Sequence, residues 1–517
     1  MKKHIMVAAI LLLATTVQPS PRLFHNSSYF DANSILMMTT NYGLYGYDVG
    51  NVFGYSHGTF YPYTGVDNIY NGTQIKSPLY SAGLWLGGKV AGVTRVSTSD
   101  FGSEYWPGPM SGGTFVSDAD TVSAYRVYKI YADSAEGNPN PDYLNWPTGQ
   151  GAPTDGLGHP LVRGSQTVWL VFNDANPARH NAINGSTSTL GIEIQQVVWG
   201  TNLTGYERVI YLEYRLFNRG GNAITNFYMT PFFDPDLGGA QDDLTGCDTL
   251  ISTIYCYNAT NSDAWYGATP PALGIRFLYG PAVASIHDSA YFFGTWIHGY
   301  RNLPMSSFVS YFNGDDPQSA AESYNLMQGL KRNGSPLANG TTFSFPGDPV
   351  AGTGDLNSTP GNPHFVASFG PIDFLPGDSQ SFVLKLVIGQ GADRLTSITD
   401  MRSLANTPDS ITTGVEEPAG PILPRSFQLG QNHPNPFNPS TVIEYSLASR
   451  SDVRLVVVDL LGRVVRTLVA QPRQAAGSYQ VIWDGRAGDG AHCSSGVYFY
   501  RLETNLGSET RKMILLK

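Results

Sequence analysis

A run of carboxylates between residues 234 and 243 is the part of the sequence best suited to chemistry. Its acids are Asp234, Asp236, Asp242 and Asp243, and they lie on a glycine-rich loop after an apolar segment. Carboxylate oxygens are the hard ligands that Ca²⁺ prefers, and such crowding disfavours ionisation unless a cation offsets it. The spacing is not that of an EF-hand, because Gly238 occupies the third ligand position. The loop is therefore either a calcium site or a solvated acidic turn, and no other cofactor is predicted.

The histidines form no catalytic motif. His287, Asp288 and His298 lie in one aromatic segment, and His364 stands apart. The sequence contains no H-E-x-x-H, G-x-S-x-G, P-loop or dinucleotide fingerprint. The paired carboxylates of a glycosidase have no fixed spacing along the chain. The sequence therefore assigns no catalytic residue, and it leaves a polysaccharide-acting hydrolase open as an alternative.

The carboxylate-rich loop follows a series of segments with the apolar alternation of strands. They are residues 79–90, 125–131, 167–173, 191–199, 208–217 and 224–233. The turn at residues 219–222 predicts that the last two pair as part of a hairpin meander. Residues 365–370 and 381–389 are predicted to pair in the same way across the turn at 375–378. One helix is predicted, at residues 391–406, from its apolar spacing.

Composition favours the same fold class. The chain has 57 Gly and 34 Pro, only 14% charged residues and 12% aromatic residues, which favours strands and turns over helices. We therefore expect a mostly β protein whose residues 21–411 form a large antiparallel β-sandwich-type region, possibly divided into two subdomains. The net charge of −10 gives no basic surface, so nucleic acid is not an expected partner.

The tryptophans and cysteines leave two questions open. Exposed aromatic rings could bind glycan or other cell-surface components, although packing in the core is the favoured reading for tryptophans 85, 106, 146, 265 and 296. Cys247 and Cys256 could form a disulfide across a hairpin in an oxidising compartment. Two buried free thiols are the alternative, and Cys493 has no partner by count.

The amino terminus has the pattern of a secretion signal. Lys2 and Lys3 precede an apolar stretch at residues 5–17, which is typical of a signal peptide and too short for a membrane-spanning helix. We expect the signal peptide at residues 1–20. No comparable apolar run follows, so no transmembrane helix is expected in the mature protein.

The last ninety or so residues form a separate pattern after a linker at residues 412–426. A proline-punctuated segment (Asn432 to Ser440) leads into strands at 453–458, 464–468, 479–483, 496–502 and 512–516. Short strands with turn signals between them predict an immunoglobulin-like β-sandwich at residues 427–517. We expect Phe437 to insert into the edge of this sandwich.

This tail resembles the type A C-terminal sorting domain of the bacterial type IX secretion system, and also the related immunoglobulin-like domain of flagellar hook-capping proteins. The matching pieces are QNHPNPFNPSTVIEYSL, VVDLLGRVVRTL, SGVYFYRL and RKMILLK. The motif residues are Pro434, Asn435, Pro436, Phe437, Asn438, Pro439, Gly462, Arg463, Gly496, Val497, Tyr498 and Lys512. One departure is His433, where an aromatic residue such as Tyr is commoner in the family.

The resemblance implies a substrate of the type IX secretion machinery that crosses the outer membrane and reaches the cell surface or the medium by way of the periplasm. The preceding region resembles uncharacterised secreted proteins with the same tail, through GLWLGGKVAG, DPDLGGAQDDLTGCDT and GPIDFLPGDSQSFVLKLVIG. That likeness brings no known activity. We therefore expect residues 21–411 to be a binding, adhesion or structural cargo, with the secreted hydrolase as the alternative.

Overall fold

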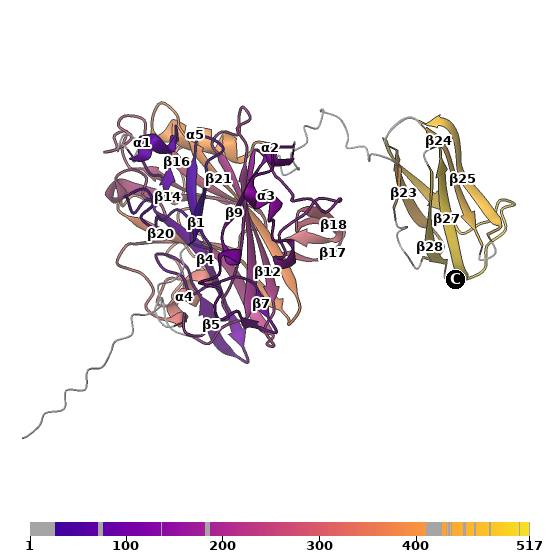
Figure 1. The fold of residues 1–517 in the computed structure, drawn as a ribbon, viewed down its shortest axis with the longest axis horizontal. Coiled ribbons are helices and arrows are strands. Elements are labelled where there is room, and N and C mark those ends of the chain that lie inside the picture. Colours follow the sequence, from indigo (N-terminus) through magenta and orange to yellow (C-terminus); the bar gives the residue numbers. More distant parts are fainter. Residues whose placement is uncertain are drawn as a thin grey trace, which may run out of the picture. The chain divides into compact units, whose positions relative to one another are not determined.

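The chain forms two compact units, Met1–Gly414 and Val415–Lys517 (Figure 1). The computed structural model describes residues 26–70, 76–135, 137–180, 187–409, 427–430, 432, 435, 437–447, 451–459, 462–474, 477–505 and 507–515. The predicted signal peptide and the predicted linker lie outside the described residues.

The larger unit is built around two antiparallel sheets. The nine-stranded sheet has the order β14-β15-β16-β21-β12-β11-β10-β6, and β9 also pairs with β10. Its strands are β6 (Trp106–Pro107), β9 (Tyr128–Tyr131), β10 (Gln166–Asn173), β11 (Ile192–Gly200), β12 (Val209–Asn218), β14 (Asp243–Asp248), β15 (Thr253–Asn258), β16 (Ala272–Tyr279) and β21 (Ser379–Gly389). The five-stranded sheet has the order β19-β20-β13-β4-β5. Its strands are β4 (Ser81–Val90), β5 (Val93–Ser97), β13 (Ile224–Asp234), β19 (Ser307–Phe312) and β20 (Pro363–Phe374).

One hydrophobic core is shared by the two sheets, which makes the larger unit a sandwich. Its buried residues from the five-stranded sheet include Leu86, Met229 and Phe365, and those from the nine-stranded sheet include Ile194, Leu212 and Leu384. Antiparallel strands with alternate residues on opposite faces account for this packing. The predicted fold class, mostly β with a large antiparallel sandwich, is confirmed.

Further layers cover the outer faces of both sheets, so many strands are buried on both sides. Helix α5 (Arg394–Ala405) places Ile398 and Met401 in a second core with Trp199 and Tyr255 of the nine-stranded sheet. Helix α4 (Ala320–Met327) packs Tyr324 and Met327 against the outer face of the five-stranded sheet. The predicted helix is confirmed as α5. Helix α4 was not predicted.

The predicted pairing of residues 208–217 with 224–233, and of residues 365–370 with 381–389, is wrong. β12 and β21 belong to the nine-stranded sheet, whereas β13 and β20 belong to the five-stranded sheet, so the turns at 219–222 and 375–378 carry the chain between sheets. Asn218 connects these two turns, because its side-chain amide donates hydrogen bonds to Asn222 O (3.0 Å) and Phe374 O (2.9 Å). An alternating pattern shows which residues face inward, but it does not show which sheet a strand joins.

The remaining elements of the larger unit are short, apart from one long hairpin. They are β1 (Ser27–Phe30), β2 (Leu36–Thr40), β3 (Thr59–Phe60), β7 (Met110–Ser111), β8 (Thr114–Phe115), the hairpin β17 (Ala282–Phe292) with β18 (Thr295–Asn302), and helices α1 (Val66–Tyr70), α2 (Ala132–Ala135) and α3 (Pro141–Leu144). Single 3₁₀ turns occur at Ser123–Tyr125, Thr148–Gln150 and Ala240–Asp242. The strand predicted at 125–131 is therefore shorter than expected.

Of the two alternatives for Cys247 and Cys256, the disulfide is wrong. Cys247 and Cys256 lie on the neighbouring strands β14 and β15, but Cys247 is opposite Ile254 and Cys256 is opposite Thr245. Diagonal neighbours in a sheet are about 7–8 Å apart, which exceeds the usual Cα separation in a disulfide. Both are buried free thiols.

The smaller unit is a sandwich of two antiparallel sheets. One has the order β22-β23-β26 and the other β25-β24-β27-β28. Its strands are β22 (Phe427–Leu429), β23 (Thr441–Leu447), β24 (Ser451–Val458), β25 (Val464–Gln474), β26 (Gly477–Trp483), β27 (Gly496–Thr504) and β28 (Gly507–Leu515). Both sheets contribute to its core, through Ile443 and Trp483 on one side and Leu455 and Leu502 on the other. Across the described residues of both units, no helix has the length and apolar character needed to span a membrane.

Candidate functional site

The proline-rich motif of the smaller unit is attached to its last strand. The Asn435 carboxamide oxygen accepts a hydrogen bond from Ile514 N (2.9 Å), and Phe437 N donates to Ile514 O (2.9 Å). Phe437 is only 2% exposed and its ring centroid lies 5.5 Å from that of Trp483. The predicted insertion of Phe437 is confirmed. Pro434 and Pro436 lie outside the described residues, whereas Asn438 and Pro439 are exposed.

Three of the other motif pieces extend this arrangement. The ring centroid of Tyr498 lies 5.4 Å from that of Trp483. In the β27–β28 ladder Val497 is opposite Ile514, and Lys512 is exposed on β28. Motif residues separated by more than sixty positions in the sequence therefore meet around one tryptophan.

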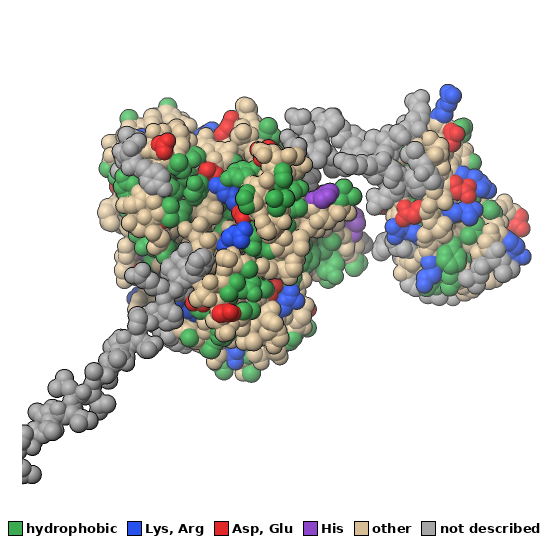
Figure 2. Space-filling model, viewed as in Figure 1, with side chains coloured by type: hydrophobic (Ala, Val, Ile, Leu, Met, Phe, Trp, Pro, Cys, Tyr) green, Lys and Arg blue, Asp and Glu red, His purple; other side chains and the backbone are tan. Residues whose placement is uncertain are grey.

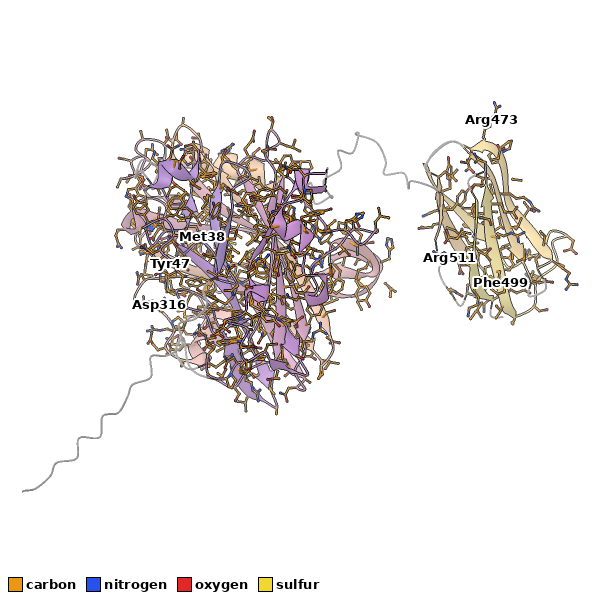
Figure 3. The ribbon with its side chains drawn as sticks, in the orientation of Figure 1. Met38, Tyr47, Asp316, Arg473, Phe499 and Arg511 are labelled. Carbon is orange, nitrogen blue, oxygen red and sulfur yellow. The ribbon has the colours of Figure 1, made fainter. Side chains whose placement is uncertain are left out.

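The glycines of the motif shape its turns. Gly462 has a φ of +75° in the β24–β25 turn, a conformation that favours glycine. Next to it, Arg463 forms an exposed ion pair with Asp459 (2.7 Å). Gly496 is the first residue of β27. Figure 3 shows Phe499 of β27 and Arg511 of β28.

Three of the four aspartates of the carboxylate-rich loop lie beside identified polar groups, whereas the buried Asp236 Oδ1 has no hydrogen-bond partner among the described residues. Asp234 ends β13 and is buried beside His364, whose Nε2 lies 3.4 Å from Asp234 Oδ1. Asp243 accepts a hydrogen bond from Leu237 N (3.0 Å), and Asp242 accepts one from the Asn258 side chain (3.0 Å). Nowhere in the described part of the chain do three or more His, Cys, Asp or Glu side chains gather in a way that could hold a metal ion. Calcium binding by Asp234, Asp236, Asp242 and Asp243 stays a prediction.

A further aspartate organises this loop. Asp263 accepts hydrogen bonds from Gly239 N (2.8 Å) and Trp265 N (2.7 Å). A Cβ on Gly238 would lie 2.2 Å from the Asp263 carboxylate, so the close approach requires glycine. Sequence reasoning missed Asp263, because it lies twenty residues beyond the loop and belongs to no motif.

His364 joins the loop to a second carboxylate from a distant segment. Its Nδ1 lies 2.7 Å from Asp316 Oδ1, and its ring is fully buried. Burial lowers the pKa of His364, but the hydrogen bond to Asp316 and the nearby Asp234 and Asp236 outweigh it, so the pKa is raised. Figure 3 marks Asp316 near the edge of the larger unit. The sequence flagged His364 as isolated and could not show this partner.

The same cluster shifts the pKa values of its carboxyl groups in opposite directions. Burial raises the pKa of Asp234 to about 8 and that of Asp236 to about 6, and in both cases His364 opposes the rise. Burial also acts on Asp316, but the hydrogen bond with His364 lowers its pKa overall. The Asp316–His364 contact therefore joins a buried imidazole to a carboxylate whose side chain is 31% exposed, and burial disfavours ionisation of Asp234 beside it. This arrangement is typical of a structural polar network.

An open cleft of about 700 Å³ lies next to this network, along the edge strand β19. Tyr311, whose ring centroid is 5.7 Å from that of His364, and Phe312 form part of one wall. The segment between α4 and β20 contributes most of the remaining lining, including Lys331, Asn333, Phe345 and Asp355. A volume in this range is typical of small-molecule sites. No sequence signal marked it, because its residues belong to a stretch without periodicity.

Three of the five candidate tryptophans are part of the core. Trp85, Trp106 and Trp146 are buried and Trp265 is half-buried, whereas Trp296 is 58% exposed. Trp296 lies on the β17–β18 hairpin, where it packs against Tyr279 and Tyr291. The face of the larger unit visible in Figure 2 accordingly carries scattered, small hydrophobic areas among uncharged polar surface. Packing in the core, the favoured reading, holds for three of the five tryptophans.

Residues 438–508 match the family described as FlgD Ig-like domain. This match, together with the two packed sheets, identifies the C-terminal unit as an immunoglobulin-like domain. No curated protein matches the chain.

Three solved structures show weak likeness. One is a polysaccharide lyase (8% identity, TM-score 0.25). The match covers 95% of this chain and 46% of the lyase. Another is dimeric latent PorU from Porphyromonas gingivalis (13% identity, TM-score 0.17; 69% of this chain, 32% of that one). The third is PorZ, described as a surface component of the type IX secretion system of the same organism (10% identity, TM-score 0.14; 70% and 44%). The chain spans less than half the length of each, and likeness at this level carries no argument about function.

Proposed function

We propose that this protein is a substrate of the type IX secretion machinery and that its C-terminal immunoglobulin-like domain is the sorting signal. The route leads through the periplasm and across the outer membrane to the cell surface or the medium. One observation carries the proposal: the separate pieces of the sorting motif pack together on one sandwich. Asn435 and Phe437 are bound to β28, and Tyr498 joins Phe437 around Trp483.

The division of the chain into two units supports a sorting signal that can be separated from the rest of the protein. Each unit has its own hydrophobic core, so the larger unit does not depend on the sorting domain for its packing. A recognition module that folds by itself can be read by a receptor without disturbing what it carries.

Deletion of residues 427–517 tests the export proposal. The expected result is folded larger unit retained in the periplasm, detected by fractionation and by resistance of the retained protein to protease. Normal appearance of the truncated protein outside the cell would contradict the proposal.

We further propose that the larger unit is a binding module outside the cell. The open cleft beside β19 supports this role, because its volume and mixed lining resemble those of ligand sites. Adhesion and a structural role at the surface are the related possibilities that share this location.

A secreted hydrolase acting on polysaccharide is the second candidate, and the same cleft favours it. Asp315 and Asp355 both line the cleft and both are exposed, and glycoside hydrolysis uses a pair of carboxylates. The test is release of reducing sugar from a panel of polysaccharides by the parent, by Asp315→Asn and by Asp355→Asn. Release by the parent that both variants abolish would establish the hydrolase, and no release would exclude it for those substrates.

A further inference from the structure

We propose that the cleft beside β19 binds a neutral oligosaccharide, which would contact Tyr311, Asp315, Lys331, Asn333, Phe345 and Asp355. The inference rests on the proposed binding role of the larger unit and names its site and its ligand class. It does not depend on the proposed route of export.

The way the cleft is built disfavours a peptide that would extend the sheet. β19 is an edge strand, yet several of its outer backbone groups are occupied: Phe308 N donates to Thr342 O (2.9 Å) and Phe308 O accepts from Ser344 N (2.8 Å). Further along, Ser310 N donates to the hydroxyl of Ser344 (3.2 Å). Strand addition needs free main-chain groups. A ligand in this cleft is therefore recognised mainly by side chains.

A long irregular segment forms the opposite wall. Between the end of α4 at Met327 and the start of β20 at Pro363 the chain contains no helix or named strand, and all of these residues are described. Connections longer than about 12–15 residues without secondary structure are uncommon in compact domains and are usually functional. This segment contributes most of the residues that line the cleft.

Several hydrogen-bonding groups in the cleft are available to a ligand. Among the described residues, the Asp315 carboxylate and the Lys331 ammonium have no side-chain hydrogen bond or ion pair, and both residues are exposed. Asp355 accepts one hydrogen bond, from the Asn339 amide (2.7 Å), which leaves capacity on its other oxygen. Hydroxyl groups both donate and accept, so a sugar can use carboxylate, amide and ammonium partners together.

Aromatic rings complete the recognition chemistry. Tyr311, Phe312 and Phe345 line the same cleft. The face of an aromatic ring is negative, and a sugar ring presents polarised C–H groups to it. Apolar rings next to free polar groups suit a ligand that has both faces, and an oligosaccharide has both.

The charges in the cleft favour a neutral ligand. Arg332 is already engaged, because it lies 3.6 Å from Glu322 and donates to Asp316 O (2.9 Å). That leaves one ammonium, on Lys331, against the two carboxylates of Asp315 and Asp355. An acidic polysaccharide would meet net repulsion at this site, whereas a neutral one would not.

The irregular wall is held in place before any ligand binds. Phe345 adopts a φ of +50°, which is unusual for a bulky residue. Its carbonyl oxygen accepts a hydrogen bond from Cys247 N of β14 (3.1 Å). Asn357 donates to Thr245 of the same strand (3.3 Å), and Asp348 pairs with Arg402 of α5 (2.9 Å). A preorganised wall reduces the entropy lost on binding.

Isothermal titration of the purified full-length protein tests the inference. The probes are the neutral hexasaccharides of cellulose, xylan, mannan and chitin, with oligogalacturonate as the acidic comparison. The expected result is binding of at least one neutral probe and weaker binding of the acidic one. Asp315→Ala and Lys331→Ala should each weaken binding about tenfold, which corresponds to about 1.4 kcal/mol.

Asp118→Ala is the matched control, because Asp118 is also exposed and does not line the cleft. Circular dichroism of each variant should match that of the parent, since the three side chains are exposed. Failure of all neutral probes to bind at millimolar concentration, stronger binding of the acidic probe, or equal effects of the control and the cleft variants would each overturn the inference. An exported protein that binds no sugar would refute this site and leave the export proposal intact.

Discussion

The ring of Phe437 should be the main anchor of the proline-rich motif on the immunoglobulin-like domain. It is 2% exposed and packs 5.5 Å from Trp483, while its backbone N–H holds Ile514 O. Phe437→Ala keeps that backbone hydrogen bond and removes the ring, and buried Phe→Ala changes cost about 3–5 kcal/mol. A domain of this size has a free energy of unfolding of about 5–15 kcal/mol, so the variant should lose a large part of it.

Differential scanning calorimetry of the full-length protein can measure this loss. We expect two transitions, and Phe437→Ala should lower the Tm of the immunoglobulin-like domain by at least about 10 °C while leaving the transition of the larger unit unchanged. Ile482→Ala is the control, since Ile482 lies in the same unit and is 67% exposed; its effect should stay within about 0.5 kcal/mol. An unchanged transition of the immunoglobulin-like domain would refute the anchoring role, and a joint shift of both transitions would refute the independence of the units.

Three further predictions concern the larger unit. Burial raises the pKa of Glu104 to about 8, whereas the unfolded chain releases this proton above an ordinary pKa near 4.5. The free energy of unfolding should therefore fall as the pH rises between these two values. Glu104→Gln should reduce that fall in denaturant titrations, and an unchanged pH slope would contradict the assignment. Asp316 favours the protonated form of His364 through a 2.7 Å contact. The stabilisation from His364 is therefore complete below pH 6.5 and is lost as the pH rises through its raised pKa. In NMR titration Asp316→Asn should lower the pKa of His364, and the same titration midpoint in parent and variant would argue against the Asp316–His364 interaction. Calorimetric titration of Ca²⁺ should detect binding that Asp236→Ala and Asp242→Ala weaken if the carboxylate-rich loop is a calcium site, and no heat with the parent protein would end that hypothesis.

The sequence predicted the local elements well, because their signals are local. The strands around Ile194, Leu212 and Leu384 and the helix containing Ile398 and Met401 follow from apolar periodicity alone. The insertion of Phe437 followed from a proline-punctuated segment beside a predicted sandwich.

Long-range arrangement was not predictable in the same way. The crossings at Asn218 depend on hydrogen bonds to Asn222 and Phe374, and periodicity does not encode them. The Asp316–His364 pair joins positions 48 residues apart, and the cleft lining comes from an aperiodic segment. Such sites form only when the tertiary fold brings the residues together, so a single sequence gives no pattern to read.

Transfer of the C-terminal unit to another protein tests the central claim most directly. Residues 427–517 would be fused to a reporter that carries its own signal peptide and normally stays in the periplasm, in a bacterium that has a type IX secretion system. We predict that the reporter appears at the cell surface or in the medium, and that it stays in the periplasm in a strain lacking the system. Retention of the fusion in the periplasm of the competent strain would contradict the account.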